Sequence, residues 1–472
     1  MALPFRTLND YFASVFPGKV QKIAVNAGLG CPNRDGTLGR DGCTYCSNAA
    51  FSPSYARGAL AAQIEAGKKF FQAKGRPWGY LAYFQSFTGT YGPTEKLIGL
   101  YEEALACPDV VGLVIATRPD CLADDLLEYF RHRFGADAPE GHPYLLVELG
   151  VESTRDDTLE RINRGHNWAC AQEAVLRLHE AGIAVGAHLI IGLPGECEED
   201  FIEHTRRLAK LPISTLKLHQ LQIIKGTAME REYAAHPEDF DLMTPERYAS
   251  VVRRILEVLR PDIALDRFVS ESPADMVIAP RWGLKPAEFL SILEREILTN
   301  MPLEELWELF PVTLVPHRDC WRDWFREEKS SLQKIFPQAI ISHIGSTAVN
   351  GLMAKPIVDI LMEFPSLEDM GTAAQAMESR GYIRMSDSST RISLNKGYTL
   401  RGYAPKVFHL HLRLRGDNDE IRFRDILRSN PTLAKKYEEL KISLAARYKF
   451  DRDAYTEGKT EFITCAASGT YA

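Results

Sequence analysis

The first 270 residues alternate short apolar runs with stretches of helical spacing, and this alternation limits the fold more than any other feature of the sequence. GYLAYFQS, VVGLVIAT and IAVGAHLIIG have the length and composition of buried strands, whereas AQEAVLRLHEAG gathers its apolar residues on one helical face and ends at a glycine. Strands that alternate with helices form a parallel sheet covered by those helices. We therefore predict an α/β fold, a barrel or an open doubly wound sheet, with its chemistry at the carboxyl ends of the strands.

The chain is long enough for more than one hydrophobic core, because 472 residues exceed the size at which a single core usually stops growing. PVTLVPHRDCWRDWF restarts the sequence with two prolines and a cluster of aromatic residues. We place a boundary near Phe310, with one domain over 1–310 and a smaller one over 311–472. SHIGSTAVNGLMAKPIVDILMEF predicts a turn, a Gly-Ser loop and a strand, and VFHLHLRLRG predicts a second strand before a helical tail. The smaller domain is thus predicted to be α+β.

Composition and charge narrow the class of protein. The amino-terminal stretch lacks the basic start and apolar run of a secretory signal, and no window approaches the roughly 20 apolar residues of a membrane span. We interpret the protein as cytoplasmic and not membrane-bound. The net charge is -7, yet residues 391–450 carry 14 Lys and Arg against 6 Asp and Glu. This segment is either a footprint for a polyanion or a mixed-charge helical surface.

Three of the nine cysteines are clustered in CPNRDGTLGRDGCTYC, at positions 31, 43 and 46. An odd number of cysteines without a secretory address indicates reduced thiols and metal ligands rather than a disulfide framework. Structural zinc and closed iron–sulfur carriers both take four protein ligands. Three thiolates suit a 4Fe–4S cluster with one iron left open, and zinc stays an alternative if a fourth ligand comes from elsewhere.

The order of several motifs then makes the chain resemble the radical S-adenosylmethionine (SAM) superfamily. These motifs are CPNRDGTLGRDGCTYC, YFQSFTGTY, ELGVES, LERINRGH, HLIIGLPGE, KLHQLQIIKGT and IAPRWGL. The long first cysteine gap is similar to the YtqA/YhcC subgroup, which is related to the catalytic subunit of elongator. Two positions depart from the subgroup's pattern: Gly89 stands where asparagine is expected and Glu152 where glutamine is usual.

The resemblance implies a partial (β/α)6 TIM-type barrel in which Cys31, Cys43 and Cys46 ligate a 4Fe–4S cluster. The open iron would bind SAM, and reduction by a donor such as flavodoxin or ferredoxin would cleave SAM to a 5′-deoxyadenosyl radical. The cofactor carries this chemistry and the barrel positions it. No protein base is needed for the primary cleavage, and the catalytic residues beyond the cluster are left unassigned.

Six further residues are implied as contacts of the cofactor. Tyr45 matches the aromatic residue before the last cysteine, and Arg164 suits a carboxylate because a guanidinium binds it in a bidentate fashion. Ser153 is equally well explained as a helix cap, and the glycines of GLPG by the turn itself. The full set of candidate cofactor contacts is Tyr45, Glu148, Ser153, Arg164, Gly192 and Glu196.

The smaller domain is similar to GrpB-like proteins, which have a nucleotidyltransferase-like fold; HIGSTAVNGLMAKPIVDI, FHLHLRL and IRFRDILRSNP carry this resemblance. Active nucleotidyltransferases pair carboxylates at i and i+2, but position 361 is leucine here. We therefore favour a ligand- or RNA-binding domain over an active transferase. The candidate ligand site combines backbone donors and a lysine for phosphate, a carboxylate for Mg²⁺ and two histidines on one strand face: Gly345, Ser346, Lys355, Asp359, His409 and His411.

By resemblance, the expected reaction is modification of the wobble uridine side chain of tRNA, with tRNA as partner. Two alternatives stay open at the level of sequence. One is a non-catalytic zinc or iron–sulfur RNA-binding protein, and the other is a radical SAM enzyme that acts on a small metabolite.

Overall fold

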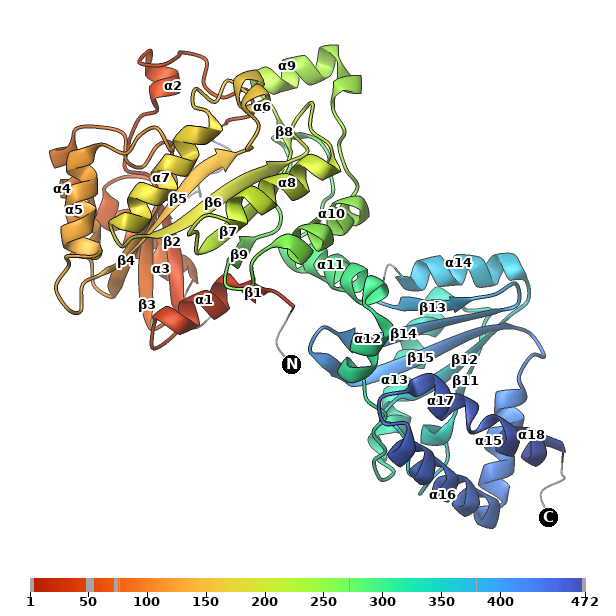
Figure 1. The fold of residues 1–472 in the computed structure, drawn as a ribbon. Coiled ribbons are helices and arrows are strands. Elements are labelled where there is room, and N and C mark those ends of the chain that lie inside the picture. The colour runs from red at the N-terminus through yellow and green to blue at the C-terminus, as the bar shows by residue number, and fades with distance from the viewer. Residues whose placement is uncertain are drawn as a thin grey trace. The chain divides into compact units, whose positions relative to one another are not determined.

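The fold is that of a computed structural model, which describes residues 4–47, 55–71, 75, 77–270, 272–378 and 380–468. The chain separates into two compact units, which divide between Leu293 and Glu294 within helix α11 (Pro286–Asn300). Figure 1 shows both units as ribbons. The domain boundary that we placed near residue 310 stays a prediction.

The first unit is built on one parallel sheet of eight strands in the order β1-β9-β7-β6-β5-β4-β3-β2. A short antiparallel pair, β8 with β10, lies apart from this sheet. The strands are β1 (Arg6–Thr7), β2 (Val20–Val25), β3 (Gly79–Phe84), β4 (Val110–Thr117), β5 (Tyr144–Glu152), β6 (Ala184–Ile191), β7 (Thr215–Gln220), β8 (Ile223–Ile224), β9 (Ala264–Arg267) and β10 (Val277–Ala279).

Helices follow most of these strands and cover the outer face of the curled sheet, as Figure 1 shows. The predicted partial barrel of alternating strands and helices is confirmed. The helices are α1 (Leu8–Val15), α2 (Pro32–Asp35), α3 (Leu60–Phe71), α4 (Thr94–Leu105), α5 (Asp124–Phe134), α6 (Asp156–Arg161), α7 (Trp168–Glu180), α8 (Glu198–Ala209), α9 (Ala228–Ala235), η3 (Pro237–Asp239), α10 (Pro245–Val258) and α11.

The barrel interior changes character along the strands. At the amino ends, Phe12 and Phe16 of α1 pack against Leu81 and Leu146 and form an apolar floor. Along β5 the same face continues beyond Leu146 with Glu148, because successive side chains of a strand alternate between its two faces. Polar groups therefore gather at the carboxyl ends, and the apolar floor keeps water from reaching them from below.

The second unit contains a five-stranded sheet in the order β11-β12-β15-β14-β13, in which only β12 and β15 run parallel. A helix covers part of one face: Met370 and Ala373 of α14 pack on Ile360 and Leu410. The strands are β11 (Ile340–Ile344), β12 (Val358–Phe364), β13 (Ile383–Asp387), β14 (Arg391–Thr399) and β15 (Gly402–Leu414). The helices are α12 (Leu303–Leu309), α13 (Cys320–Ile335), η4 (Ser346–Ala348), α14 (Leu367–Glu378), α15 (Asp419–Ser429), α16 (Pro431–Arg447), α17 (Arg452–Glu457) and α18 (Thr460–Ser468).

One local prediction in this unit was wrong. The segment that we expected to be a turn before the Gly-Ser loop is the strand β11. His343 within it stacks on Phe325 of α13, so a polar residue occupies a packed position that its sequence does not reveal. Within the part of the chain that the structure describes, no helix combines the length and apolar character that crossing a bilayer requires.

Candidate active site

The three clustered cysteines lie on the loop that follows β2, at the carboxyl end of the first barrel strand. Cys31 precedes α2, and its carbonyl accepts hydrogen bonds from the amides of Arg34 and Asp35 at 2.9 and 3.2 Å. Cys46 donates its amide to the carbonyl of Cys43 at 3.1 Å. The glycine-rich loop between them thus folds back on itself, and the structure brings all three thiols to the wall of one cavity.

Two asparagines fasten this loop to the segment after α6. Asn33 is 2% exposed, and its amide nitrogen donates to the carbonyl of Asn163 at 2.5 Å. Asn163 returns the contact by donating to the carbonyl of Gly42 at 2.7 Å. The Asn33 amide nitrogen also lies 3.6 Å from the sulfur of Cys43. Sequence reasoning missed both asparagines, although NRDG and INRG lie within the motifs that carried the resemblance.

The cavity has a volume of about 210 Å³ and opens at the carboxyl ends of the strands. Of the predicted cofactor contacts, Tyr45, Glu148 and Arg164 line it. Its polar lining also includes Arg34, Gln85, Thr88, Thr117, Arg118, Glu152, His188, Lys217, His219, Gln220, Gln222 and Ser270.

Arg164 is buried beside the cysteine loop. One terminal nitrogen lies 3.5 Å from the sulfur of Cys43, and the other donates to the carbonyl of Gly150 at 2.6 Å and lies 3.7 Å from the Glu152 carboxylate. Burial disfavours the charged form, but nearby groups that include the Cys43 sulfur and Glu152 raise the pKa of Arg164 well above its usual value. A side chain at position 150 is excluded, because its Cβ would lie 2.5 Å from the guanidinium.

The backbone that presents Glu152 is strained. Glu152 has a φ of 67°, in the left-handed region, and the pairing of β5 with β6 shifts register between Gly150 and Glu152. Such a conformation costs on the order of 1–3 kcal/mol and collects at functional sites. The bulge directs the carboxylate of Glu152 towards Arg164, so the residue that departs from the subgroup's pattern is part of this cavity's electrostatics.

Arg118, which sequence reasoning missed, is a second buried guanidinium in the lining. It binds Asp120 through two hydrogen bonds of 2.8 and 2.7 Å, and its remaining terminal nitrogen has no partner in the described structure. The Nε of Arg164 is also buried and unpartnered. Unpaired buried donors are costly. Two such donors beside three thiols fit an anionic group in the cavity, as a thiolate-bound iron–sulfur cluster with the carboxylate of SAM would provide.

Glu148 lies at the centre of an ionic network in the barrel. Its carboxylate is 3.2 Å from the ammonium of Lys22 and 3.1 Å from that of Lys217. It also contacts the ring of His188 at 2.9 Å and accepts a hydrogen bond from the hydroxyl of Tyr83 at 2.6 Å. Burial alone would raise the pKa of Glu148, but the two lysines hold it well below its usual value. The carboxylate is therefore charged and saturated with protein partners.

The remaining predicted contacts lie behind the cavity. Ser153 is fully buried; its hydroxyl donates to Glu196 at 2.5 Å and accepts from the amide of Arg155, the residue before α6, at 3.0 Å. Glu196 also lies 3.1 Å from His204. Gly192 follows β6 with a φ of 100°, which explains a glycine there. Among the residues described as lining the cavity, none of these three appears. Their assignment as cofactor contacts stays a prediction.

The second unit brings together most of its predicted ligand residues. Asp359 on β12 pairs in register with His409 on the neighbouring strand β15, and His411 projects from the same face. Gly345 packs directly on Asp359, because a Cβ there would lie 2.3 Å from the carboxylate. The Mg²⁺ that we expected at Asp359 is not supported, since Mg²⁺ takes oxygen ligands and two of the three donor side chains here are imidazoles.

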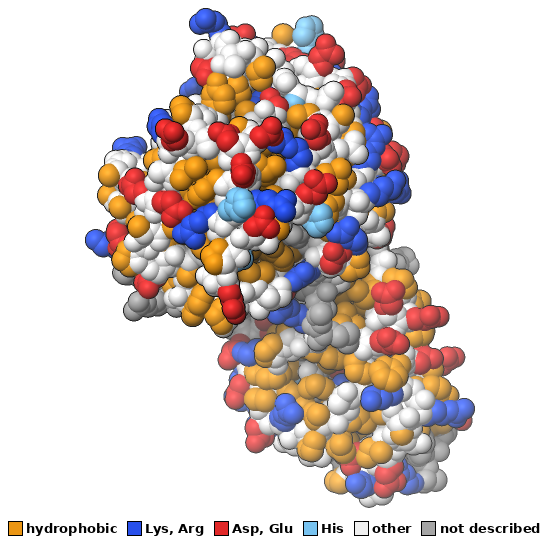
Figure 2. Space-filling view, turned by 60° about the vertical axis from the view of Figure 1, so that its left-hand side comes forward, with side chains coloured by type: hydrophobic (Ala, Val, Ile, Leu, Met, Phe, Trp, Pro, Cys, Tyr) orange, Lys and Arg blue, Asp and Glu red, His pale blue; other side chains and the backbone are white. Residues whose placement is uncertain are grey.

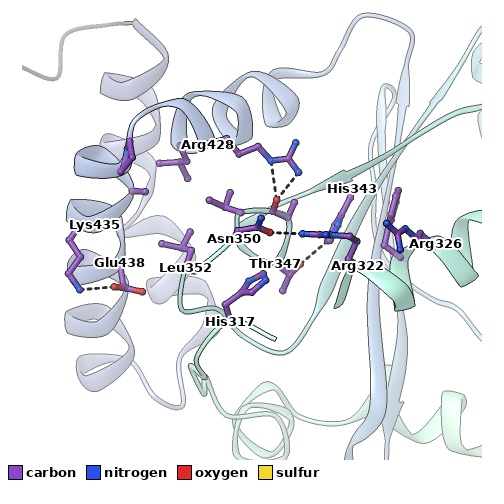
Figure 3. Close-up of a pocket in the computed structure, with 17 residues that line it drawn as sticks. His317, Arg322, Arg326, His343, Thr347, Asn350, Leu352, Arg428, Lys435 and Glu438 are labelled. Carbon is purple, nitrogen blue, oxygen red and sulfur yellow. Dashed lines mark hydrogen bonds and ion pairs between the residues drawn. The ribbon is translucent and has the colours of Figure 1, made fainter. Parts of the chain in front are cut away.

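A separate cavity of about 680 Å³ lies beside the Gly-Ser loop of the second unit and is drawn in Figure 3. Arg322 and Arg326 reach it from α13, and Arg428 reaches it from α15. Arg322 donates to the side-chain oxygen of Asn350 at 3.0 Å, and Arg428 donates to the carbonyl of Ala348 at 2.7 Å. The lining contains more basic than acidic groups, so this cavity favours an anionic ligand.

Comparisons with known proteins agree with this geometry. Family models match residues 25–208 ("Radical SAM superfamily"), 213–299 ("Radical_SAM C-terminal domain") and 311–468 ("GrpB protein"). The uncharacterized protein YtqA of Bacillus subtilis is 37% identical over 296 residues, which cover 62% of this chain and 89% of YtqA. The glutamate-rich protein GrpB of Alkalihalophilus pseudofirmus is 35% identical over 163 residues, which cover 32% of this chain and 91% of that protein.

Among solved structures, Elp3 from the archaeon Methanocaldococcus infernus is similar with 18% identity and a TM-score of 0.41, covering 55% of this chain and 59% of that one. The resemblance predicted from the motifs is confirmed for both parts of the chain by the family matches and by the two relatives.

Proposed function

The chain belongs to the radical SAM superfamily, in the group of YtqA, and carries a GrpB domain; from this premise we propose that it is a radical SAM enzyme that modifies tRNA at the side chain of a wobble uridine. The observation that carries the enzymatic part is the cavity in which Cys31, Cys43 and Cys46 meet the unpartnered donors of Arg118 and Arg164. The family implies a 4Fe–4S cluster and SAM.

When bound, the cluster and SAM supply a 5′-deoxyadenosyl radical that abstracts a hydrogen atom from the substrate. We propose that the three cysteines hold the cluster and that Arg164, Tyr45 and Glu148 face SAM. Arg164 and Arg118 offset the negative charge of the thiolates, because each retains a buried donor without a partner among the residues that the structure describes. The apolar floor formed with α1 closes the amino-terminal side of the cavity to water, which limits side reactions of a radical.

Lys217 supports the same cavity from the strand next to β6. It is 3% exposed and donates to Tyr83 at 2.9 Å as well as to Glu148. Because Glu148 is fixed by these partners, we propose that its role is to hold the cavity wall in place and to present a constant negative charge. A reducing partner such as flavodoxin or ferredoxin is required by the chemistry and belongs to the proposal.

Support for tRNA comes from the second unit. Arg322, Arg326 and Arg428 line the cavity of Figure 3 around the Gly-Ser loop, and phosphate oxygens are the natural partners of such guanidinium groups. The basic segment 391–450 is partly neutralised by ion pairs, such as Arg391 with Asp417 at 2.7 Å. Figure 2 likewise shows acidic and basic side chains interspersed on the face in view. The arginines of the cavity are therefore stronger support for tRNA binding than the net charge of segment 391–450.

The proposal is tested by comparing the modified nucleosides of tRNA from cells with and without the gene. We expect one wobble-uridine derivative to disappear in the deletion strain and to return with the wild-type gene but not with a Cys43→Ala variant. An unchanged nucleoside profile would contradict the tRNA assignment.

A tRNA-binding assay is a second, independent test of the proposal. Arg322→Ala combined with Arg428→Ala is expected to weaken tRNA binding at least tenfold and to lower its salt dependence. Arg206→Ala, which removes an exposed arginine of α8, serves as the matched control and should leave affinity within twofold. If tRNA does not bind, and a small metabolite rather than tRNA stimulates 5′-deoxyadenosine formation, the small-metabolite alternative replaces this proposal.

A further inference from the structure

Three side chains on one face of the second unit's sheet are close enough to share a single ion. The Asp359 carboxylate lies 3.3 Å from Nδ1 of His409 and 3.7 Å from Nε2 of His411. The three ligand atoms all lie within 4.8 Å of one another. Metal–ligand bonds of about 2.1 Å place neighbouring ligand atoms about 3.0–3.4 Å apart in octahedral or tetrahedral sites. The cluster thus needs only a small contraction to close on a metal.

The two imidazoles decide which metals fit. Two histidines and one carboxylate on one side of an ion, with other positions open, are typical of sites for Fe(II), Zn²⁺ and related first-row metals. Mg²⁺ and Ca²⁺ prefer oxygen ligands throughout. The side chains of Asp359 and His411 are 27% and 23% exposed, so an ion has access from solvent.

Neighbouring groups fix the cluster in place. The free ring nitrogen of His409, Nε2, lies 2.9 Å from the hydroxyl of Tyr398, which in turn accepts a hydrogen bond from Arg452 at 2.6 Å. Metal-binding histidines are usually oriented by a partner on the second ring nitrogen. Gly345, with φ 70° and ψ -172°, leaves space for the Asp359 carboxylate that any side chain would fill. His409 and Asp359 are therefore held near the positions that a shared ion requires.

Three cations lie near the cluster: Lys355 and Lys459 each interact electrostatically with Asp359, and Arg452 contacts Tyr398, the partner of His409. The ammonium groups of Lys355 and Lys459 lie 5.4 and 4.4 Å from the centre of the Tyr455 ring. Within the described residues, neither lysine nor Arg452 has a carboxylate within ion-pair distance. A divalent ion among these cations is unfavourable unless an anion accompanies it, because like charges repel strongly in a partly buried site. Lys355, Lys459 and Arg452 would bind such an anion and compensate its charge.

We propose that Asp359, His409 and His411 hold one divalent first-row transition-metal ion, and that Lys355, Lys459 and Arg452 bind a phosphate group that occupies its open positions. This site is separate from the iron–sulfur cluster and does not depend on the proposed tRNA reaction. Metal and phosphate should bind cooperatively, since each lowers the electrostatic cost of the other.

Binding of Mn²⁺ tests the metal part by electron paramagnetic resonance on the full chain carrying its oxidised, diamagnetic cluster. In 1 mM phosphate we expect one Mn²⁺ per chain, with affinity falling at least tenfold in Asp359→Asn and in His409→Gln. Asp425→Asn, whose carboxylate pairs with Arg424 in the same unit, is the matched control and should stay within twofold of wild type. Equal affinity in all three variants would overturn the site.

A measurement on the wild-type chain avoids dependence on variants that fold poorly. Protein grown with ¹⁵N-histidine and loaded with Mn²⁺ should show electron spin-echo couplings to the nitrogens of two imidazoles. Bound Mn²⁺ without such couplings would contradict the assignment of the two histidines.

A separate measurement tests whether the cations bind a phosphate group. Mn²⁺ affinity should rise at least fivefold when phosphate is added, and Lys355→Met should abolish that gain. Inorganic phosphate, a mononucleotide and tRNA tested in parallel assign the source of the phosphate group. If none of the three changes Mn²⁺ affinity, the role given to the cations is wrong.

Discussion

Lysines that are partly or fully buried occur in both units, but their surroundings differ. In the barrel, Lys22 and Lys217 lie among the carboxylates of Glu148 and Asp266, with nitrogen–oxygen distances of 2.7–3.7 Å. In the second unit, Lys355 and Lys459 lie near a single carboxylate, Asp359, which already contacts two histidines. The positive charge of the first pair of lysines is balanced by protein carboxylates, and that of the second pair is not.

The two environments shift the lysine pKa values in opposite directions. Burial alone lowers the pKa of Lys22, but Asp266 and Glu148 raise it above its usual value. Burial, together with the neighbouring cations Arg452 and Lys459, lowers the pKa of Lys355 to about 7. Burial also lowers the pKa of Lys441 to about 7. The charge-balanced network of the barrel stabilises the wall of its cavity. The excess of cations in the second unit is explained by a ligand that brings the missing negative charge.

The largest expected effect comes from breaking the balanced network. Lys217→Met leaves Glu148 short of one cation in a buried site and should reduce the free energy of unfolding of the first unit by about 3–5 kcal/mol at pH 7. Lys459→Met in the second unit should change the unfolding free energy of its own unit by less than about 1 kcal/mol, because it leaves no buried carboxylate unpaired. Urea unfolding of the full chain, followed unit by unit through pulsed hydrogen exchange, measures both. Equal losses would contradict the distinction.

The pH dependence of stability separates the two kinds of lysine. The folded pKa of Lys441, about 7, lies below the value of about 10.4 in an unfolded chain, so the unfolded state binds more protons between these values. The unfolding free energy of wild type should therefore rise with pH between about 7 and 10.4. The unfolding free energy of Lys441→Met minus that of wild type should fall by about 1.4 kcal/mol per pH unit from pH 8 to 9.

Lys22 provides the control for this experiment. Its folded pKa is raised, so its stabilising effect is complete below the unfolded value of about 10.4 and is lost only as pH rises through the folded pKa. Lys22→Met should therefore cost a constant amount between pH 6 and 9. Urea titrations at four pH values measure both differences. If the difference in unfolding free energy between Lys441→Met and wild type did not change with pH, folding would not deprotonate this lysine.

A smaller effect than that of Lys217→Met is expected at the glycine that faces Asp359. Gly345→Ala places a side chain in a backbone region that only glycine adopts readily, and should cost about 1–2 kcal/mol in the second unit. Because the new Cβ displaces the Asp359 carboxylate, Mn²⁺ affinity should fall as well. Gly351→Ala, at an open position with a φ of 76°, controls for the backbone cost alone and should leave Mn²⁺ affinity unchanged. Loss of Mn²⁺ binding in both variants would contradict the role of Gly345.

The sequence predicted most of the barrel because its strands are buried on both faces and read as continuous apolar runs. VVGLVIAT was predicted as a strand, and β4 spans Val110–Thr117. The rule does not locate strand ends as well, since the apolar pattern of KLHQLQIIKGT continues through Leu221 while the backbone leaves the sheet after Gln220. In the second unit, β11 was missed because His343 packs on an aromatic ring and interrupts the apolar pattern.

The site was predictable where chemistry is local in sequence and unpredictable where it depends on distant partners. The three cysteines and Arg164 lie in recognisable motifs, and the structure places them together at one cavity. The pairing of Lys22 with Asp266 joins residues 244 positions apart, and no spacing rule reveals it. Asn33 was missed for a similar reason, because its partner Asn163 lies 130 positions away.

The central claim is that the loop after β2 holds a cluster with one iron open to SAM, and anaerobic reconstitution with iron and sulfide tests it most directly. The account predicts about four irons per chain and formation of 5′-deoxyadenosine from SAM under reduction. Replacement of Cys31, Cys43 and Cys46 by alanine should abolish both, while Cys170→Ala, outside the cavity lining, should change neither. Iron content and 5′-deoxyadenosine formation that persist in the triple variant would contradict the account.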